Sequence, residues 1–245
     1  MGVTITDWNN FSFDTKNKKS FFVLSDVHGN SVLLDKLLKQ YDSRLPLVCL
    51  GDTGDRGEDS YGCFCRLNGI ENKILIYGNH DLFLKHSIRG NESAKWLWYK
   101  NGGTEFMRSL PEKKIPDFIV AMADSMKLYY RSGNLLFIHA GINPYDPLEE
   151  NLSVPEEMAF DLDKYSEWEI MQHPTWIRGK FLCYPHKILD VNNERLMIIH
   201  GHTPDTNGPI VEQNHINIDV GSYGSKPKLA AIEIRENEYR FIIAE

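Results

Sequence analysis

The chain has 245 residues, of which 42% are hydrophobic and 25% are charged, and its 34 acidic and 27 basic side chains give a net charge of -7. This composition is typical of a soluble globular protein and excludes a low-complexity chain. The acidic balance disfavours nucleic acid and anionic membranes as partners, without excluding either, and no apolar run reaches the roughly 18 residues that span a bilayer. The polar first residues lack the apolar core of a secretion signal, so we expect a cytoplasmic protein.

Short apolar runs predict five buried strands, each followed by a polar turn that often contains glycine. They cover residues 21–25, 47–50, 73–77, 135–139 and 196–200. Between the first two strands, the run SVLLDKLLKQY places its leucines near one face of a helix. Strand, helix and strand in this order predict parallel pairing through a right-handed crossover.

The remaining segments predict short helices, a cap and a β-rich end. Residues 82–123 show the spacing of several short helices. Prolines then interrupt residues 141–195, which we interpret as a cap or elaborated loop region that recognises the substrate. The runs HINIDV, KLAAIEI and YRFIIAE predict antiparallel strands. Because no linker is evident, we expect one α/β domain, residues 1–245, with mixed sheets and a small cap.

Side chains that can bind metals follow the predicted strands in the motifs DVHGN, GDTGDRG, GNHD, HAG and GHTP. In open α/β sheets, the carboxyl ends of strands gather ligands, so five such turns can meet in one crevice. Asp, His and Asn supply the bridging carboxylate and the nitrogen and oxygen ligands that two divalent cations need. For any one of these residues a hydrogen-bonded turn is the commoner role, but the whole set favours a metal site. Its members are Asp26, His28, Asp52, Asp55, Arg56, Asn79, His80, Asp81, His139, His200 and His202.

The ordered series DVHGN, GDTGDRG, GNHD, FIHAG, WIRG and HGHTP resembles the calcineurin-like metallophosphoesterases, and within them the phosphoprotein phosphatase group with its bacterial and bacteriophage members. The resemblance spans most of the chain and implies two mixed β-sheets flanked by helices. It also implies a site with two divalent metal ions. The implied ligands are Asp26 and His28 for one metal, Asn79, His139 and His202 for the other, and Asp52 as the bridge. Manganese is the metal that the family suggests, with iron and zinc as alternatives.

The same resemblance implies the roles of the remaining site residues. Arg56, Arg178 and Asn79 would bind phosphoryl oxygens, and His80 would be the general acid, oriented by Asp55. A hydroxide activated by the two metals would attack phosphorus directly. His200 would be a neighbour of the metal ligands, and Asp81 is compatible with either a binding or an orienting role.

These residues predict a protein phosphatase that acts on phosphoserine and phosphothreonine. The prediction extends to a dual-specificity enzyme, which also acts on phosphotyrosine. Asp55 favours phosphomonoesters such as phosphoproteins and phosphopeptides, because relatives that hydrolyse dinucleoside polyphosphates tend to lack this acid. Two alternatives stay open: a hydrolase of dinucleoside polyphosphates or other nucleotides, and a non-catalytic phosphate-binding scaffold. For the aromatic residues a packing role is the commoner expectation. We single out Tyr223 for testing, because its turn DVGSYG follows a predicted strand and could reach the crevice.

Overall fold

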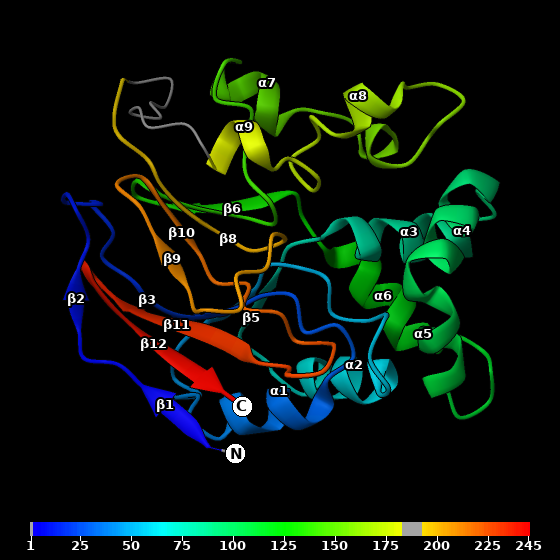
Figure 1. Ribbon diagram of the computed structural model, residues 1–245, viewed down its shortest axis with the longest axis horizontal. Helices are drawn as coiled ribbons and strands as arrows, with labels where there is room; N and C mark the ends of the chain where they lie inside the picture. Colours follow the sequence, from blue (N-terminus) through cyan, green and yellow to red (C-terminus); the bar gives the residue numbers. More distant parts are fainter. Residues whose placement is uncertain (1, 183–192) are drawn as a thin grey trace.

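The computed structural model describes residues 2–182 and 193–245, whose strands form two sheets (Figure 1). The first sheet has the order β1-β12-β11-β3-β4-β5, with β2 paired to β12, and the second has the order β6-β7-β8-β10-β9. The strands of the first sheet are β1 Val3–Ile5, β2 Asn9–Asn10, β3 Ser20–Leu24, β4 Leu47–Cys49, β5 Lys73–Leu75, β11 Leu229–Arg235 and β12 Glu238–Ala244. Those of the second are β6 Tyr129–Ser132, β7 Leu135–Ile138, β8 Met197–His200, β9 Ile210–Val211 and β10 His215–Asn217. Two mixed sheets confirm the predicted fold class.

Strand pairing agrees with the sequence at most positions. Strands β3, β4 and β5 are parallel, as predicted, and β11 and β12 are antiparallel, as predicted. The antiparallel prediction for HINIDV is confirmed only in part, because its strand β10 is antiparallel to the short β9 but pairs in parallel with β8. Alternation of side chains reports the two faces of a strand but not its partner, so local pattern alone could not decide this pairing.

The two sheets pack face to face and bury apolar side chains between them. In β3, Phe21 and Val23 lie in the cluster between the sheets, together with Phe137 and Ile199 of the second sheet. Leu24, like Phe22, belongs to the cluster on the opposite face, against the helices. Because β3 is covered on both faces, its sequence is a continuous apolar run.

Helices cover the outer face of the first sheet, as Figure 1 shows. They are α1 Ser31–Leu38, α2 Ser60–Asn68, α3 Asn79–Ile88, α4 Glu92–Trp98, the π-helical turn η1 Tyr99–Gly103, α5 Thr104–Ser109 and α6 Asp117–Ser125. The short helices predicted for residues 82–123 are confirmed. Helix α1 begins after Asn30, whose side chain accepts a hydrogen bond from the Leu33 amide. Helix α3 begins inside the GNHD motif, where the sequence indicated only a turn.

Short helices follow β7 and cover the second sheet. They are α7 Leu148–Leu152, the 3₁₀ turn η2 Glu156–Ala159, α8 Glu167–Ile170 and α9 Gly179–Leu182. Leu148 and Phe181 pack with Leu136 and Ile198 of β7 and β8. The interpretation of residues 141–195 as a substrate-recognising cap stays a prediction, and its residues 183–192 lie outside the described part of the chain. Within that part, no helix is long and apolar enough to cross a membrane.

Candidate metal centre

The predicted site residues meet where β3, β4, β5, β7 and β8 end. Each of the six predicted metal ligands follows one of these strands and is at most 5% exposed. They are Asp26, His28, Asp52, Asn79, His139 and His202. The tertiary structure therefore brings together residues that lie up to 176 positions apart, as in the hydrogen bond from the His202 amide to Asp26 Oδ2 at 2.9 Å.

The backbone is strained at this site. Ten residues other than glycine have positive φ in the described part of the chain, and six of them belong to the predicted site. These six are Asp26, His28, Asp52, Asp55, Arg56 and His202, with φ between 45° and 69°. Such conformations persist only when the surroundings enforce them, and they cluster at functional sites.

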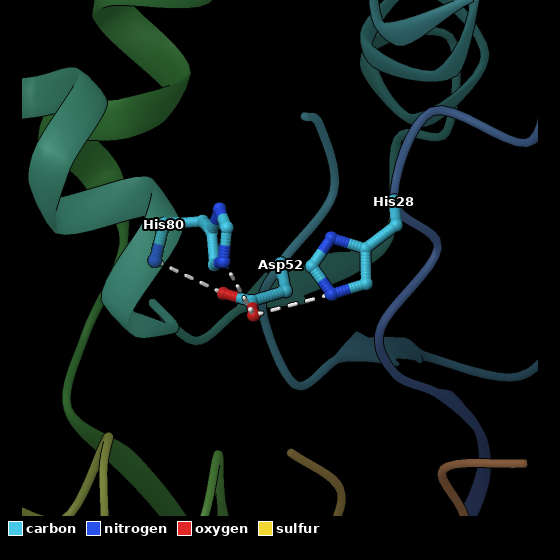
Figure 2. A group of neighbouring side chains, drawn as sticks. All are labelled: His28, Asp52 and His80. Atoms are coloured by element: carbon cyan, nitrogen blue, oxygen red, sulfur yellow. Dashed lines mark hydrogen bonds and ion pairs between the residues drawn. The ribbon is translucent and has the colours of Figure 1, made fainter. Parts of the chain in front are cut away.

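Asp52 lies at the middle of the cluster and is called the central carboxylate below. Its Oδ2 is 3.5 Å from His28 Nε2 and 3.5 Å from His139 Nε2. Figure 2 shows the carboxylate between the rings of His28 and His80. Donor atoms converge in two groups, one of His28, Asp52 and His80 and one of Asp52, His139 and His202, and Asp52 is common to both. A carboxylate shared by two groups is suited to bridge two cations.

Hydrogen bonds to the backbone fix which histidine nitrogens face the centre. His28 Nδ1 lies 3.1 Å from the Gly54 carbonyl oxygen, and His139 Nδ1 lies 2.8 Å from the Leu50 carbonyl oxygen. A carbonyl oxygen can only accept, so each Nδ1 carries the proton and each Nε2 presents a lone pair toward Asp52. This is the tautomer that a metal-binding imidazole needs.

Asn79 and His202 complete the donor set. Asn79 Oδ1 is buried and has no hydrogen-bond partner among the described residues, and His202 Nδ1 lies 3.1 Å from His139 Nε2. An orphaned polar atom in the protein interior costs free energy unless a ligand satisfies it. Oxygen and imidazole donors of this kind suit manganese, iron or zinc. The donor set of the cluster therefore fits a pair of divalent cations.

Close packing also shapes the cluster. Gly78, which precedes α3, has no room for a side chain, because an added Cβ would lie 2.0 Å from Asp52 Oδ1 and 2.8 Å from His139 Cε1. Asp81 accepts hydrogen bonds from the amides of Asp52 at 2.7 Å and Gly78 at 2.9 Å through the same Oδ2. Asp81 thus connects the loops that carry Asp52 and Asn79.

Burial sets the electrostatics of the site. It raises the pKa of Asp52 well above its ordinary value, and the nearby Asp26 charge raises that pKa further. It also lowers the pKa values of His28, His80 and His202 well below the ordinary value. All of these shifts favour neutral groups, so bound cations would be needed to hold several carboxylates ionised together. Perturbed pKa values concentrated in one place are typical of a functional site.

A second cluster lies beside the first and contains the predicted acid and phosphate-binding groups. His80 Nδ1 is 2.6 Å from Asp55 Oδ2, and Arg56 Nη2 lies 2.9 Å from His80 Nε2. Burial raises the pKa of Asp55 to about 8, against hydrogen bonding that lowers it. Arg56 Nη1 donates to the Tyr223 hydroxyl at 2.7 Å, and its guanidinium lies 4.7 Å from the centre of the Tyr223 ring. The structure thus joins Tyr223 to the site.

The remaining candidates have distinct positions. Arg178 donates to Thr203 Oγ1 at 3.1 Å, next to His202 of the cluster, and burial lowers the pKa of its guanidinium. His200 belongs to neither of the two donor groups, and its Nε2 lies 3.1 Å from His215 Nδ1.

Two residues of the site escaped the sequence analysis. Asp219 is 5% exposed and its pKa is raised by burial and then by Asp26. It follows β10 as the other acids follow their strands, which is a signal that could have identified it. Trp98, which lies in the segment predicted to form short helices, donates its indole N–H to Asp55 Oδ1 at 2.9 Å. No local pattern indicates that contact.

The sequence is similar to those of known proteins. Residues 19–243 match the family model of the calcineurin-like phosphoesterases. A serine/threonine-protein phosphatase 1 of Salmonella typhimurium is 33% identical over 102 residues, which cover 40% of this chain and 46% of that protein. A symmetrical bis(5'-nucleosyl)-tetraphosphatase of Haemophilus ducreyi is 28% identical over 157 residues, which cover 60% of this chain and 55% of that protein. The chain thus spans about half the length of these curated relatives.

Solved structures share the fold. A protein serine/threonine phosphatase from Saccharomyces cerevisiae superposes with a TM-score of 0.59 at 17% identity, covering 94% of this chain and 81% of the other. A cold-active protein-tyrosine phosphatase of a Shewanella species superposes with a TM-score of 0.55 at 18% identity, covering 93% of this chain and 83% of the other. At these identities the likeness concerns the fold.

Proposed function

The chain belongs to the calcineurin-like phosphoesterase family, and on that premise we propose that it is a metal-dependent serine/threonine protein phosphatase that releases phosphate from phosphoproteins. The observation that carries this proposal is the buried contact of 2.6 Å between His80 and Asp55. A serine or threonine alkoxide is a poor leaving group and needs a proton as it departs, whereas a phosphate leaving group needs one much less. A histidine that is oriented by an aspartate can donate that proton.

Different side chains would bind the metals, bind the phosphoryl group and donate the proton. Asp26, His28, Asp52, Asn79, His139 and His202 would hold two divalent cations, with manganese as the first choice. When bound, these cations would supply Lewis acidity and positive charge for the attack of water on phosphorus. The guanidinium groups of Arg56 and Arg178 would bind the phosphoryl oxygens through paired N–H donors. Once protonated, His80 would deliver the proton from Nε2 to the leaving oxygen, while Asp55 holds Nδ1. Arg56, which donates to Nε2 at 2.9 Å in this structure, would then turn to the phosphoryl oxygens.

Hydrolysis of dinucleoside polyphosphates is the second candidate. It is favoured by the match to the tetraphosphatase of Haemophilus ducreyi, which extends over more of this chain than the match to the protein phosphatase. The same cations and arginines would serve an anhydride, for which His80 matters less. A non-catalytic phosphate-binding role is the third reading and is opposed by the full set of donors.

One experiment separates these candidates. Chelator-stripped protein is resupplied with manganese, zinc, iron or magnesium and assayed with an aryl phosphate, a phosphoserine peptide and a dinucleoside tetraphosphate. We expect manganese to restore phosphate release from the peptide, and we expect Asp52→Asn to abolish it. Asp163→Asn, a change at an exposed aspartate outside the cluster, is the matched control. A much higher kcat/KM for the dinucleotide would overturn the proposal, and no release with any metal would favour the binding role.

His80→Asn tests the assigned acid. We expect it to lower release from the phosphoserine peptide by about 100-fold or more, the scale of general acid catalysis. Unchanged release in pure protein would contradict the role of His80. The cytoplasmic location expected from the sequence would be checked by fractionation of cells that express the protein.

A further inference from the structure

Both oxygens of the Asp55 carboxylate have a defined partner. Asp55 Oδ2 lies 2.6 Å from His80 Nδ1, and Asp55 Oδ1 accepts the indole N–H of Trp98 at 2.9 Å. Trp98 is 3% exposed and Asp55 is 2% exposed. Water therefore does not compete for either hydrogen bond, and the plane of the carboxylate is fixed from both sides.

The segment that carries Trp98 packs directly against the turn that carries Asp55. Helix α4 ends at Trp98 and continues into the π-helical turn η1. In that turn Gly102 has a φ of 119°, and an added Cβ would lie 2.7 Å from the Arg56 amide nitrogen. The Phe106 ring of α5 packs on the indole with its centre 5.4 Å away. These contacts hold the indole in place against the Asp55 side chain, and π-helical turns frequently occur at functional sites.

The indole N–H of Trp98 donates to a carboxylate, and this distinguishes its contact from ordinary packing. A buried indole N–H needs an acceptor, and a backbone carbonyl suffices. The partly buried Trp176 shows that ordinary case, since it donates to the Ala159 carbonyl oxygen at 2.8 Å. Trp98 instead donates to the carboxylate that contacts His80, 43 positions away in the sequence.

We propose that Trp98 is a positioning residue of the proton-donating pair, whose indole N–H fixes the Asp55 carboxylate so that Asp55 holds His80 in the orientation that delivers a proton. The inference rests on the proposed function, because it concerns a leaving group that needs this proton. Loss of the N–H leaves Oδ1 of Asp55 buried without a donor, which disfavours the ionised carboxylate and frees it to rotate. Trp98 itself does not touch the substrate.

The test compares two esters that differ in their need for a proton. A nitrophenyl phosphate releases a stable phenolate, whereas a phosphoserine peptide or a simple alkyl phosphate releases an alkoxide. We expect Trp98→Phe to lower kcat for the alkyl esters by about 10-fold, the loss of one hydrogen bond to a charged group, with KM unchanged. For the nitrophenyl ester we expect a change below about 2-fold, because proton transfer contributes little there. Trp96→Phe, on the same helix but 54% exposed, is the matched control and should leave both rates unchanged.

A double-mutant cycle shows whether the effect passes through Asp55. We expect Asp55→Asn to give the same selectivity for leaving groups as Trp98→Phe, and we expect Trp98→Phe to add nothing in the Asp55→Asn background. Equal losses on both esters, or additive losses in the double variant, would show that Trp98 acts only through packing and would overturn the inference.

A spectroscopic measurement does not depend on the folding of the Trp98 variant. The chain has five tryptophans, so a protein labelled with ¹⁵N gives five indole signals. We expect the Trp98 signal to exchange slowly with solvent and to shift in Asp55→Asn while the Trp96 signal stays in place. A Trp98 signal unmoved by Asp55→Asn would overturn the inference.

Failures of the two proposals are distinguishable. If wild-type protein hydrolyses both model esters but releases no phosphate from phosphopeptides, the proposed function fails while the ratios between variants still test Trp98. If wild-type protein hydrolyses only the nitrophenyl ester, both proposals fail.

Discussion

Replacing Asp81 tests whether this buried acid binds a metal or holds the loops that do. Its Oδ2 accepts the amides of Asp52 at 2.7 Å and Gly78 at 2.9 Å, and Asp81 is 2% exposed. Each buried N–H that loses its acceptor costs about 1–3 kcal/mol, so Asp81→Ala should lower the free energy of unfolding by about 2–6 kcal/mol. That is a large part of the roughly 5–15 kcal/mol by which native proteins are stable.

Asp81→Asn separates hydrogen bonding from charge. The amide oxygen of asparagine can still accept both N–H groups, so we expect a loss of about 1 kcal/mol and nearly normal metal binding. Urea unfolding of the metal-free proteins gives the free energies, and calorimetric titration with manganese gives the affinities. Asp52→Asn is the reference for loss of a proposed ligand. If Asp81→Asn lost manganese as completely as Asp52→Asn while its unfolding free energy stayed unchanged, Asp81 would be a ligand and the reasoning above would be refuted.

Three further perturbations follow from the geometry. Gly78→Ala places a methyl group 2.0 Å from the central carboxylate at a φ of -90°, which alanine tolerates, so metal affinity should fall about 10-fold or more by calorimetry. Gly69→Ala is the control and should leave metal affinity unchanged, because its added methyl carbon would lie 3.5 Å from the nearest atom. Equal metal affinities of the two variants would contradict the expected crowding at Gly78. Burial lowers the pKa of His173 to about 3, below its ordinary 6.5, so its contribution to stability is present above pH 6.5 and is lost as pH falls toward 3. His173→Gln should therefore flatten the pH dependence of the unfolding free energy by about 1 kcal/mol per pH unit below 6.5, and an unchanged slope would contradict this. Tyr223→Phe removes the hydroxyl that holds Arg56 at 2.7 Å, so KM for phosphoesters should rise about 5-fold with little change in kcat, and a loss confined to kcat would oppose the assignment.

The local patterns predicted much of the fold. Continuous apolar runs located β3, β4, β7 and β8, because both faces of each are covered in the folded protein. They also located the edge strand β5, whose Lys73 and Ile74 are half-buried. The same patterns missed β1, β2, β6 and β9, which are only two to four residues long and therefore give no periodic signal. They also did not show that the HINIDV strand β10 pairs in parallel with β8 in the second sheet.

The candidate site, too, was predicted from the sequence only in part. The donors that converge at the strand ends were identified from the motifs, whereas the role of Trp98 was not. A tryptophan has the same sequence signature whether its N–H meets a backbone carbonyl, as that of Trp176 does, or a carboxylate, as that of Trp98 does.

The sequence by itself determined which donors follow each strand, because strand periodicity and turn residues act between neighbours in the chain. Only the tertiary structure decided which nitrogen of His28 and His139 faces the centre, through bonds to Gly54 and Leu50. It also decided that Arg56 meets Tyr223, 167 positions away. Such contacts depend on how the two sheets and their loops pack, and no local pattern specifies that packing.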